Sequence, residues 1–434
     1  MILMLQNTPV LQFDIDDGIY NVLDENLLPL RLKDIYNQNS SNTMKDLQRN
    51  YGAMLDFLSH RVLNLDRINA KKILNAYNFS QSQDSITKAK IAVTCKAVSM
   101  SDDYWLNDDK QSFSWKTINP RKNSLNKIIS HIALTGSSLT INGQPHTPEL
   151  ATQGAYAKAW IREEDGPYLY KASTKGNNES KVEIAVSQIL DHFNIPHVKY
   201  EKAYWNEQNV TLDICKCKVM NNDRYSIVTA EDLYSYCSRI NTDFLKQSLS
   251  IDKENFYKTC VTDYLISNID RHMQNWGFYM DNKTGILVSN HPLFDHNNAF
   301  DRENILSEDG GNSLMLSGYS QKEAAEYAIK KCDIKCIAPL SKNHFLQEEH
   351  YESFMKRASD LGLYELEKKT FFQNIFSKTD TYIPKSLYPD AKNGLENFMK
   401  PDVLINNETN LFEEKLEGLS NEQNFSTITK DIIH

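Results

Sequence analysis

Residues 268–301 read NIDRHMQNWGFYMDNKTGILVSNHPLFDHNNAFD, and this stretch decides the fold. Two strand-like apolar runs, 276–280 and 286–289, flank a turn made of Asp, Asn, Lys, Thr and Gly. This pattern predicts a β-hairpin. Because a hairpin brings its two ends together, we expect the polar residues just outside the two strands to meet in one small volume.

Three of those outer residues carry chemistry: Asp270, Asn275 and Asp295. Two carboxylates and an amide oxygen that face one another are costly unless a cation neutralises them, and hard oxygen ligands suit Mg²⁺. We expect Asp270 to orient or deprotonate an acceptor hydroxyl, and Asn275 and Asp295 to hold the metal. The plainer alternative is that all three are turn residues. The predicted turn lies between them, however, which favours the functional interpretation.

Upstream, the periodicity predicts a second hairpin followed by a helix. Residues 151–162 and 168–172 alternate as strands, and the second strand carries Lys171. Residues 179–193 have apolar positions at helical spacing, with Glu183 near the start. An inward lysine needs a partner. We therefore expect a Lys171–Glu183 pair that positions the lysine on ATP phosphates. The alternative is a strand-edge lysine in solvent.

The segment before Lys171 offers a candidate phosphate loop, with Gly154 and, four residues later, Lys158. One glycine is a weak signal, and a plain connection into the hairpin remains the alternative. Backbone amides here would cradle phosphates, with Lys158 adding charge. Arg271 and His272 are further candidates for phosphate or metal-shell contacts, and His272 fits a structural hydrogen-bonding role equally well.

The order of elements resembles that of a kinase. After the helix come three strand-like runs, 198–205, 210–219 and 224–228, and then mainly helical sequence. We predict an α+β, two-lobed, protein-kinase-like fold with a β-rich small lobe and a helical large lobe, preceded by a largely helical N-terminal region. The predicted parts are the N-terminal region 1–148, the small lobe 149–232, the large lobe 233–405 and a polar tail 406–434.

Within the N-terminal region, residues 1–35 alternate short β-like runs with turns, whereas 44–79 and 86–100 have helical spacing. A second helix is expected to start at Ala70, with Asn69 as its N-cap. Residues 102–116 are rich in Trp, Tyr and Asp and show no clear period. The role of the region is left open.

Composition narrows the classes of function. The 434 residues carry a formal charge of −9, which argues against nucleic acid as the main partner. The longest apolar runs are far short of a membrane span, and the start lacks the pattern of a signal peptide. The seven cysteines are scattered without a Cys-x-x-Cys motif, which disfavours zinc sites and disulfides. A reduced, cytoplasmic location is expected.

The catalytic segment resembles that of the HipA-like serine/threonine kinases of bacteria. Their pattern Asp-x-His-x-x-Asn, then a hydrophobic residue and Asp after a hairpin, stands here as Asp270, His272, Asn275 and Phe294-Asp295. Their Gly-x-x-x-Lys loop, strand lysine and helix glutamate are matched by Gly154, Lys158, Lys171 and Glu183.

The resemblance implies a kinase that uses ATP and Mg²⁺ on a protein Ser/Thr hydroxyl. Asp270 and His272 would be catalytic. The adenine hinge would lie at 228–232, including Thr229 and Glu231, and would bond mainly through backbone. The family's toxin–antitoxin members also suggest an antitoxin-like partner. Resemblance covers roughly 150–380.

The sequence departs from the family pattern in places. Gln274 stands where the toxin kinases often have Lys, and Tyr156 replaces a common Gln in the phosphate loop. No serine stands where those toxins phosphorylate themselves, although Thr152 lies close. Residues 1–148 do not match the best-known toxin of the family, so toxicity and target are not implied.

Two other classes of function compete with the kinase. One is a pseudokinase that keeps the fold only to bind a partner, and the intact Lys171, Asp270, Asn275 and Asp295 set counts against it. The other is a metal-dependent hydrolase that uses Asp270, His272, His291 and Asp295, with His296 nearby. Transition-metal hydrolase sites usually cluster their histidines more tightly.

Overall fold

The computed structural model describes residues 1–14, 20–35, 44–108, 113–143, 146–174, 177–207, 210–334, 340–365 and 370–371. The chain divides into two compact units, Met1–Thr379 and Asp380–His434, and every described residue lies in the first. The predicted tail, the last part of the predicted large lobe and Cys336 fall outside the described residues.

The N-terminal region contains a four-stranded antiparallel sheet, which the expectation of a largely helical region understated. The sheet has the order β3-β2-β1-β4, with β1 (Ile2–Leu5), β2 (Thr8–Phe13), β3 (Tyr20–Val22) and β4 (Tyr104–Asn107). The strand-like runs at the start of the chain form the first three. Tyr104, Trp105 and Leu106 of β4 are all buried, so the sequence of this strand shows no alternation.

The predicted helices of this region are present with shorter bounds. They are α1 (Met44–Ser59), α2 (Ala70–Ala76) and α3 (Ser85–Thr94). Two further helices, α4 (Trp115–Ile118) and α5 (Lys127–Thr135), were not predicted. The Asp84 side chain caps α3 by accepting from the Thr87 N–H. Asn69 precedes α2 as predicted but makes no side-chain cap, because its Nδ2 donates to the Ala133 carbonyl instead.

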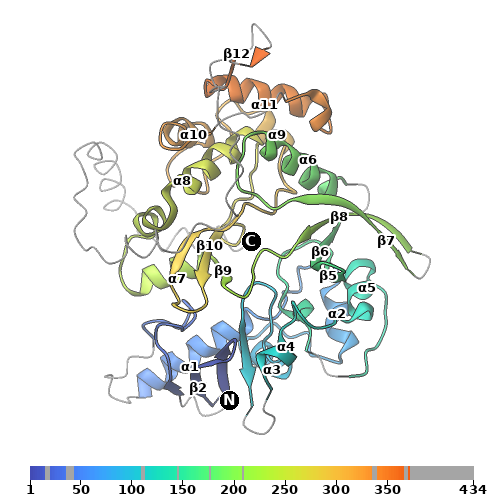
Figure 1. Ribbon diagram of the computed structural model, residues 1–434, viewed down its shortest axis with the longest axis vertical. Helices are drawn as coiled ribbons and strands as arrows, with labels where there is room; N and C mark the ends of the chain where they lie inside the picture. The colour runs from blue at the N-terminus through green and yellow to red at the C-terminus, as the bar shows by residue number, and fades with distance from the viewer. Residues whose placement is uncertain are drawn as a thin grey trace. The chain divides into compact units, whose positions relative to one another are not determined.

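A second antiparallel sheet follows the one-turn helix η1 (Pro148–Ala151) and carries Lys171. Its order is β5-β6-β8-β7, with β5 (Lys158–Glu163), β6 (Gly166–Ala172), β7 (Tyr200–Glu207) and β8 (Val210–Lys218). The helix α6 (Glu179–His192) packs against β7 and β8, as Figure 1 shows. Its buried Val182, Val186 and Ile189 are the apolar stripe that predicted a helix over 179–193.

The third strand predicted for the small lobe, 224–228, belongs to a different sheet. As β9 (Tyr225–Thr229) it pairs with β10 (Gly277–Asp281), which in turn pairs with β11 (Leu287–Asn290). Gly277 permits this pairing, because a Cβ there would lie 2.2 Å from the Val228 carbonyl oxygen. On its other side β9 meets the N-terminal region, where the Ile227 N–H donates to the Ser101 carbonyl (2.7 Å).

The rest of the described chain is mainly helical, as predicted. It comprises α7 (Ala230–Arg239), α8 (Phe244–Leu265, kinked at Asp252), α9 (Arg302–Leu306), α10 (Gln321–Ala328), η2 (Lys342–His344) and α11 (Glu348–Asp360), with a short β12 (Tyr364–Glu365) and β13 (Thr370–Phe371) pair. None of the helices among the described residues combines the length and apolar character needed to cross a membrane. The antiparallel sheets and separate helices agree with the mixed fold class predicted.

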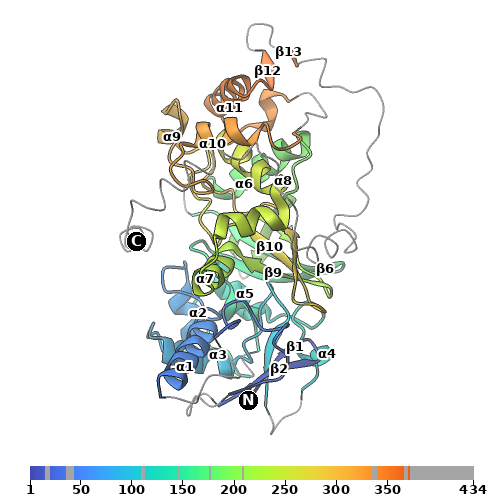
Figure 2. The same cartoon turned by 90° about the vertical axis from the view of Figure 1, so that its left-hand side faces the viewer.

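Ion pairs fasten the N-terminal region to the following elements, and Figure 2 shows the N-terminal helices, in blue, next to α7. Arg31 contacts Glu231 (2.6 Å) and Asp232 (2.5 Å) at the start of α7. Arg121 contacts Asp223 (3.2 Å) in the turn before β9. The arginine side chains are largely buried, so these contacts are less screened than surface pairs.

Candidate active site

The predicted hairpin of the catalytic segment is confirmed, with β10 and β11 each within one residue of the predicted runs. After β11, the chain forms a parallel bridge between Leu293 and His197. The Val198 N–H donates to the Leu293 carbonyl (2.8 Å), and the Leu293 N–H donates to the Pro196 carbonyl (2.9 Å). This bridge fixes Asp295 close to the sheet that carries Lys171.

Lys171 lies at the centre of a buried ionic cluster. Its Nζ contacts a Glu183 carboxylate oxygen, lies 2.6 Å from Asp295 Oδ1 and 3.4 Å from the Tyr200 hydroxyl. The structure therefore brings together the predicted Lys171–Glu183 pair and adds Asp295 to it. Lys171 is 6% exposed and Glu183 1%, so neither is the solvent-facing side chain of the alternative interpretation.

The cluster shifts the pKa values of its members. Burial lowers the pKa of the Lys171 ammonium, but Asp295 and Glu183 more than offset this and hold it well above its usual value. For Asp295, burial acts to raise the pKa, and the ammonium groups of Lys171 and Lys158 outweigh it and lower the pKa of the carboxyl. Asp295 also has a φ of 58°, a left-handed conformation that is uncommon for a non-glycine residue and concentrates at functional sites.

Asp270 and Asn275 are held together by the backbone of the catalytic segment. The Asn275 Nδ2 donates to the Asp270 carbonyl (2.7 Å), and the Asn298 Nδ2 donates to Asp270 Oδ2 (2.8 Å). His272 Nδ1 accepts from the Gln274 N–H (3.2 Å), so its Nε2, 3.7 Å from Asp270 Oδ1, carries the proton of the neutral ring. The Asp270 carboxylate therefore has a fixed direction.

Arg271 is not a phosphate or metal-shell contact. It is 1% exposed, and its guanidinium pairs with the buried Asp263 (3.1 Å). Its Nη1 donates to the carbonyls of Asn275 (2.9 Å) and Phe294 (2.8 Å). Arg271 thus ties the loop of Asp270 to the residue before Asp295, and its role is structural. Sequence patterns do not reveal this contact, because Asp263 lies on the preceding helix α8 and Arg271 in the loop after it.

Gly154 and Lys158 lie close together where the loop leads into β5, the first strand of the second sheet. Gly154 has a φ of +95°, and a Cβ on it would come within van der Waals overlap of Lys158 Nζ. Lys158 pairs across the strands with Lys171, and both are buried. Burial lowers the pKa of Lys158 to about 8, and the Lys171 charge adds to this. Like charges facing each other are destabilising, so this pair suits a polyanionic ligand.

Tyr156 in the same loop reaches the catalytic segment. Its hydroxyl donates to Asn298 Oδ1 (3.1 Å), and Asn298 in turn holds Asp270. Sequence reasoning missed Asn298 and the neighbouring Asn297. The signal available was their position directly after the Asp295-His296 pair, within the stretch that decides the fold.

Three N–H donors of the predicted adenine hinge at 228–232 are engaged within the protein. The Thr229 side chain and Asp232 form a capping box at the start of α7. The Ala230 N–H donates to the Trp276 carbonyl (3.0 Å) and the Glu231 N–H to the Met273 carbonyl (3.1 Å). The Thr229 N–H is also engaged, by Asp232 (3.3 Å). These three N–H groups are occupied by protein, so neither Thr229 nor Glu231 has a free backbone N–H to donate to adenine.

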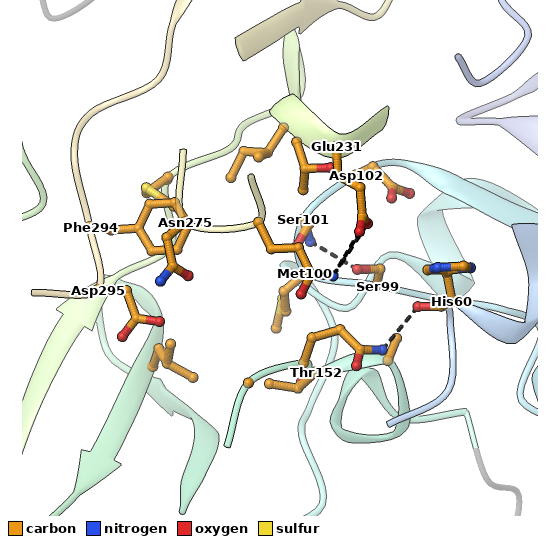
Figure 3. A pocket seen from close by; sticks show the side chains of 18 of the residues that line it. His60, Ser99, Met100, Ser101, Asp102, Thr152, Glu231, Asn275, Phe294 and Asp295 are labelled. Carbon is orange, nitrogen blue, oxygen red and sulfur yellow. Dashed lines mark hydrogen bonds between the residues drawn. The ribbon is translucent and has the colours of Figure 1, made fainter. Parts of the chain in front are cut away.

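The site opens into a cavity of about 620 Å³, within the usual range for ligand pockets. Figure 3 shows Asn275, Phe294 and Asp295 on one side and residues of the N-terminal region on the other: His60, Ser99, Met100, Ser101 and Asp102. Every predicted site residue except Glu183 and Arg271 lines it directly. Its apolar part includes Leu169 on β6, Val198, and Val219 and Met220 just after β8.

Two histidines of the hydrolase alternative, His291 and His296, have their Nδ1 atoms engaged by other groups. The His291 Nδ1 lies 2.9 Å from the Pro292 carbonyl, and its ring packs against Tyr279 and Phe294. The His296 Nδ1 lies 3.1 Å from Arg271 Nη2. Burial lowers the pKa of His291 to about 4. Within the described ranges, no group of three or more His, Cys, Asp or Glu side chains is arranged to hold a metal ion.

Comparison with known proteins gives little guidance. No protein-family model matches the chain, and no curated protein matches it. Among solved structures, a Helicobacter pylori proinflammatory kinase, CtkA, is similar with a TM-score of 0.36 and 15% sequence identity. That likeness covers 48% of this chain and 88% of the other. A TM-score of this size does not establish a shared fold.

Proposed function

We propose that the protein is an ATP- and Mg²⁺-dependent serine/threonine protein kinase of HipA-like type, with a two-lobed kinase fold. The observation that carries the proposal is the buried Lys171, held between Glu183 and Asp295. A lysine ordered by a helix glutamate next to a metal-binding carboxylate is the nucleotide arrangement of protein kinases. The acceptor would be a Ser/Thr hydroxyl of another protein. An antitoxin-like partner and a cytoplasmic location remain predictions.

The donor set beside Asp295 fits Mg²⁺. The Asn275 Nδ2 is engaged at the Asp270 carbonyl, so the amide oxygen is the atom left for a cation. Asn297 Oδ1 is buried in the wall of the same cavity and has no hydrogen-bond partner among the described residues. One carboxylate and amide oxygens, completed by phosphate and water, are typical of Mg²⁺ sites. When bound, the ion neutralises charge on the phosphates.

The residues around the cavity have distinct tasks in this mechanism. Lys171 and Lys158 hold the phosphates, since both ammonium groups face the same end of the cavity. Asp270, aimed by Asn298, would accept a hydrogen bond from the acceptor hydroxyl and take its proton as the new O–P bond forms. The bond between the γ-phosphorus and the β–γ bridging oxygen would break in the same step, with ADP as the leaving group. Most of the rate enhancement comes from positioning and charge neutralisation. Adenine would occupy the apolar part of the cavity, next to Val219 and Met220.

The test is incubation of the purified full chain with γ-labelled ATP and Mg²⁺, alongside Asp270→Ala and Asp295→Ala. We expect label to move to the protein itself or to a protein in a lysate, and both variants to lose the transfer. Wild-type protein that neither transfers label nor binds Mg·ATP in a calorimeter would contradict the proposal.

A second candidate is a pseudokinase that binds nucleotide without transfer. Lys171 occupies Oδ1 of Asp295, and a protein that never binds a metal ion would keep this ion pair. Binding of Mg·ATP with no transfer to any lysate protein would support this candidate.

A further inference from the structure

The phosphate loop, residues 152–158, is fastened from outside by a segment of the N-terminal region. That segment, residues 60–68, connects α1 to α2 and runs beside the loop. The Ile68 N–H donates to the Ala155 carbonyl in the middle of the loop (2.7 Å). The Gln153 Nε2 donates to the carbonyls of His60 (2.9 Å) and Val62 (3.1 Å). Both segments, 60–68 and 152–158, therefore contribute backbone atoms to the contact.

Arg67 makes the closest set of contacts to the loop. Its Nη1 donates to the Thr152 carbonyl (2.9 Å) at the start of the loop, and its Nη2 donates to the Lys158 carbonyl (2.6 Å) at the end. One planar group thus sets the separation of the two ends. Arg67 is 2% exposed, which makes these hydrogen bonds costly to break.

The position of Arg67 is itself fixed. Its Nη1 also donates to the Glu149 carbonyl (3.0 Å), and its Nη2 lies 3.4 Å from Glu149 Oε2. Glu149 is 1% exposed, and its Oε1 accepts from the Trp160 N–H on β5 (2.5 Å). A buried carboxylate therefore neutralises the arginine and anchors it to the first strand after the loop.

We propose that Arg67 is a positioning residue for the nucleotide site and that the segment 60–68 holds the phosphate loop in its binding geometry. The role in nucleotide binding rests on the function proposed above. The physical basis is that a bidentate fork across both ends of a loop removes its freedom before the ligand arrives, which lowers the entropic cost of binding. Lysine cannot replace this fork. The N-terminal region is thereby part of the active site.

The test compares Arg67→Lys with Arg121→Lys in the full chain. Arg121 is a matched control, because it is also a buried arginine of the N-terminal region that pairs with a buried carboxylate, Asp103, but it does not touch the loop. The measurements are amide hydrogen exchange of residues 152–158, the Kd for Mg·ATP and the thermal midpoint. Gln153→Ala provides a milder variant if Arg67→Lys fails to fold.

We expect Arg67→Lys to speed exchange in 152–158 and to raise the Kd about tenfold, since small misplacement of a binding group is expensive. Arg121→Lys should lower the thermal midpoint while leaving loop exchange and Kd within about twofold. Gln153→Ala should also speed exchange in 152–158 and raise the Kd for Mg·ATP, but by less than Arg67→Lys.

Unchanged loop exchange in Arg67→Lys, or equal effects of both arginine variants, would overturn the proposal. The exchange measurement needs no nucleotide, so it judges the contact even if the protein does not bind Mg·ATP. Faster loop exchange in Arg67→Lys, together with a wild type that binds no nucleotide, would support the fastening of the loop and refute the proposed function alone.

Discussion

Lys171 Nζ lies 2.6 Å from Asp295 Oδ1, although 124 residues separate them in the sequence. One comes from β6 and the other from the segment after β11, so this contact joins the second sheet to the catalytic segment. It places the group expected to bind phosphate beside the group expected to bind metal. The properties of the site should therefore depend on both residues at once.

Asp295→Asn should remove part of the acid sensitivity of folding. The folded-state pKa of Asp295 is lowered, so its stabilising contribution is present above the unfolded pKa of about 4 and is lost as the pH falls below it. Urea unfolding at pH 7 and pH 3 measures this. We expect the free energy of unfolding to fall by about 2 kcal/mol at pH 7 and to depend less on pH than that of the wild type. Asp213→Asn, at an exposed position, is the control and should leave the pH dependence unchanged.

Lys158 should make nucleotide binding weaken in mild alkali. Burial lowers its pKa to about 8, so the ammonium form dominates at pH 7 and is lost by pH 9. The protonated fraction falls roughly tenfold over that range, which sets the expected upper limit for the rise in Kd for Mg·ATP. Calorimetry at both pH values tests this. Lys158→Arg keeps its charge and should flatten the profile; an equally steep profile in that variant would contradict the assignment to Lys158.

Asn298→Ala should reduce turnover more than nucleotide affinity. Asn298 donates to Asp270 Oδ2 and is expected to act by aiming this carboxylate. We expect kcat to fall on the order of tenfold or more, with the KM for ATP changed much less. Tyr156→Phe removes the contact on the far side of Asn298 and leaves the Asn298–Asp270 bond intact. Equal losses of kcat in the two variants would show that the Asp270 contact is not the cause.

Arg271→Lys should destabilise the fold. Arg271 is buried, pairs with Asp263 and holds two carbonyls that a lysine cannot reach together. We expect a loss of roughly 3 kcal/mol in urea unfolding. Arg224→Lys is a suitable comparison, because this half-exposed arginine pairs with Asp281 near the surface. It should cost less than about 0.5 kcal/mol. Similar losses of unfolding free energy in Arg271→Lys and Arg224→Lys would contradict a structural role specific to Arg271.

The local elements could be predicted from the sequence because their periodicity is strong. The hairpin around the Asp281–Gly285 turn and the helix with Val182, Val186 and Ile189 were predicted within one residue. The pairing of β9 could not be predicted, since strand periodicity says which residues form a strand but not which neighbour it takes. Its partner depends on the small size of Gly277 and on Ser101, far away in the chain.

The site was predictable where a charged side chain would cost free energy if it were buried without a partner. A mid-strand Lys171 and a helical Glu183 implied each other, and the structure brings them together. Arg67 could not be recognised, because its contacts with the phosphate loop are to backbone carbonyls, and every residue type carries a carbonyl. The engaged donors at 228–232 could not be foreseen for a similar reason, since the residue types do not show that the capping box of Thr229 and Asp232 uses the Thr229 N–H.

The strand β9 pairs with β10 on one side, and on its other side the Ile227 N–H donates to the Ser101 carbonyl. A gene fragment that began after residue 148 would encode this strand with an open edge, and open edges recruit other chains. Recombination between relatives at that point would carry the same penalty, since Arg31 and Arg121 would lose their carboxylate partners as well. The N-terminal region and the remainder of the described chain are therefore expected to be inherited as one piece, rather than exchanged as separate modules.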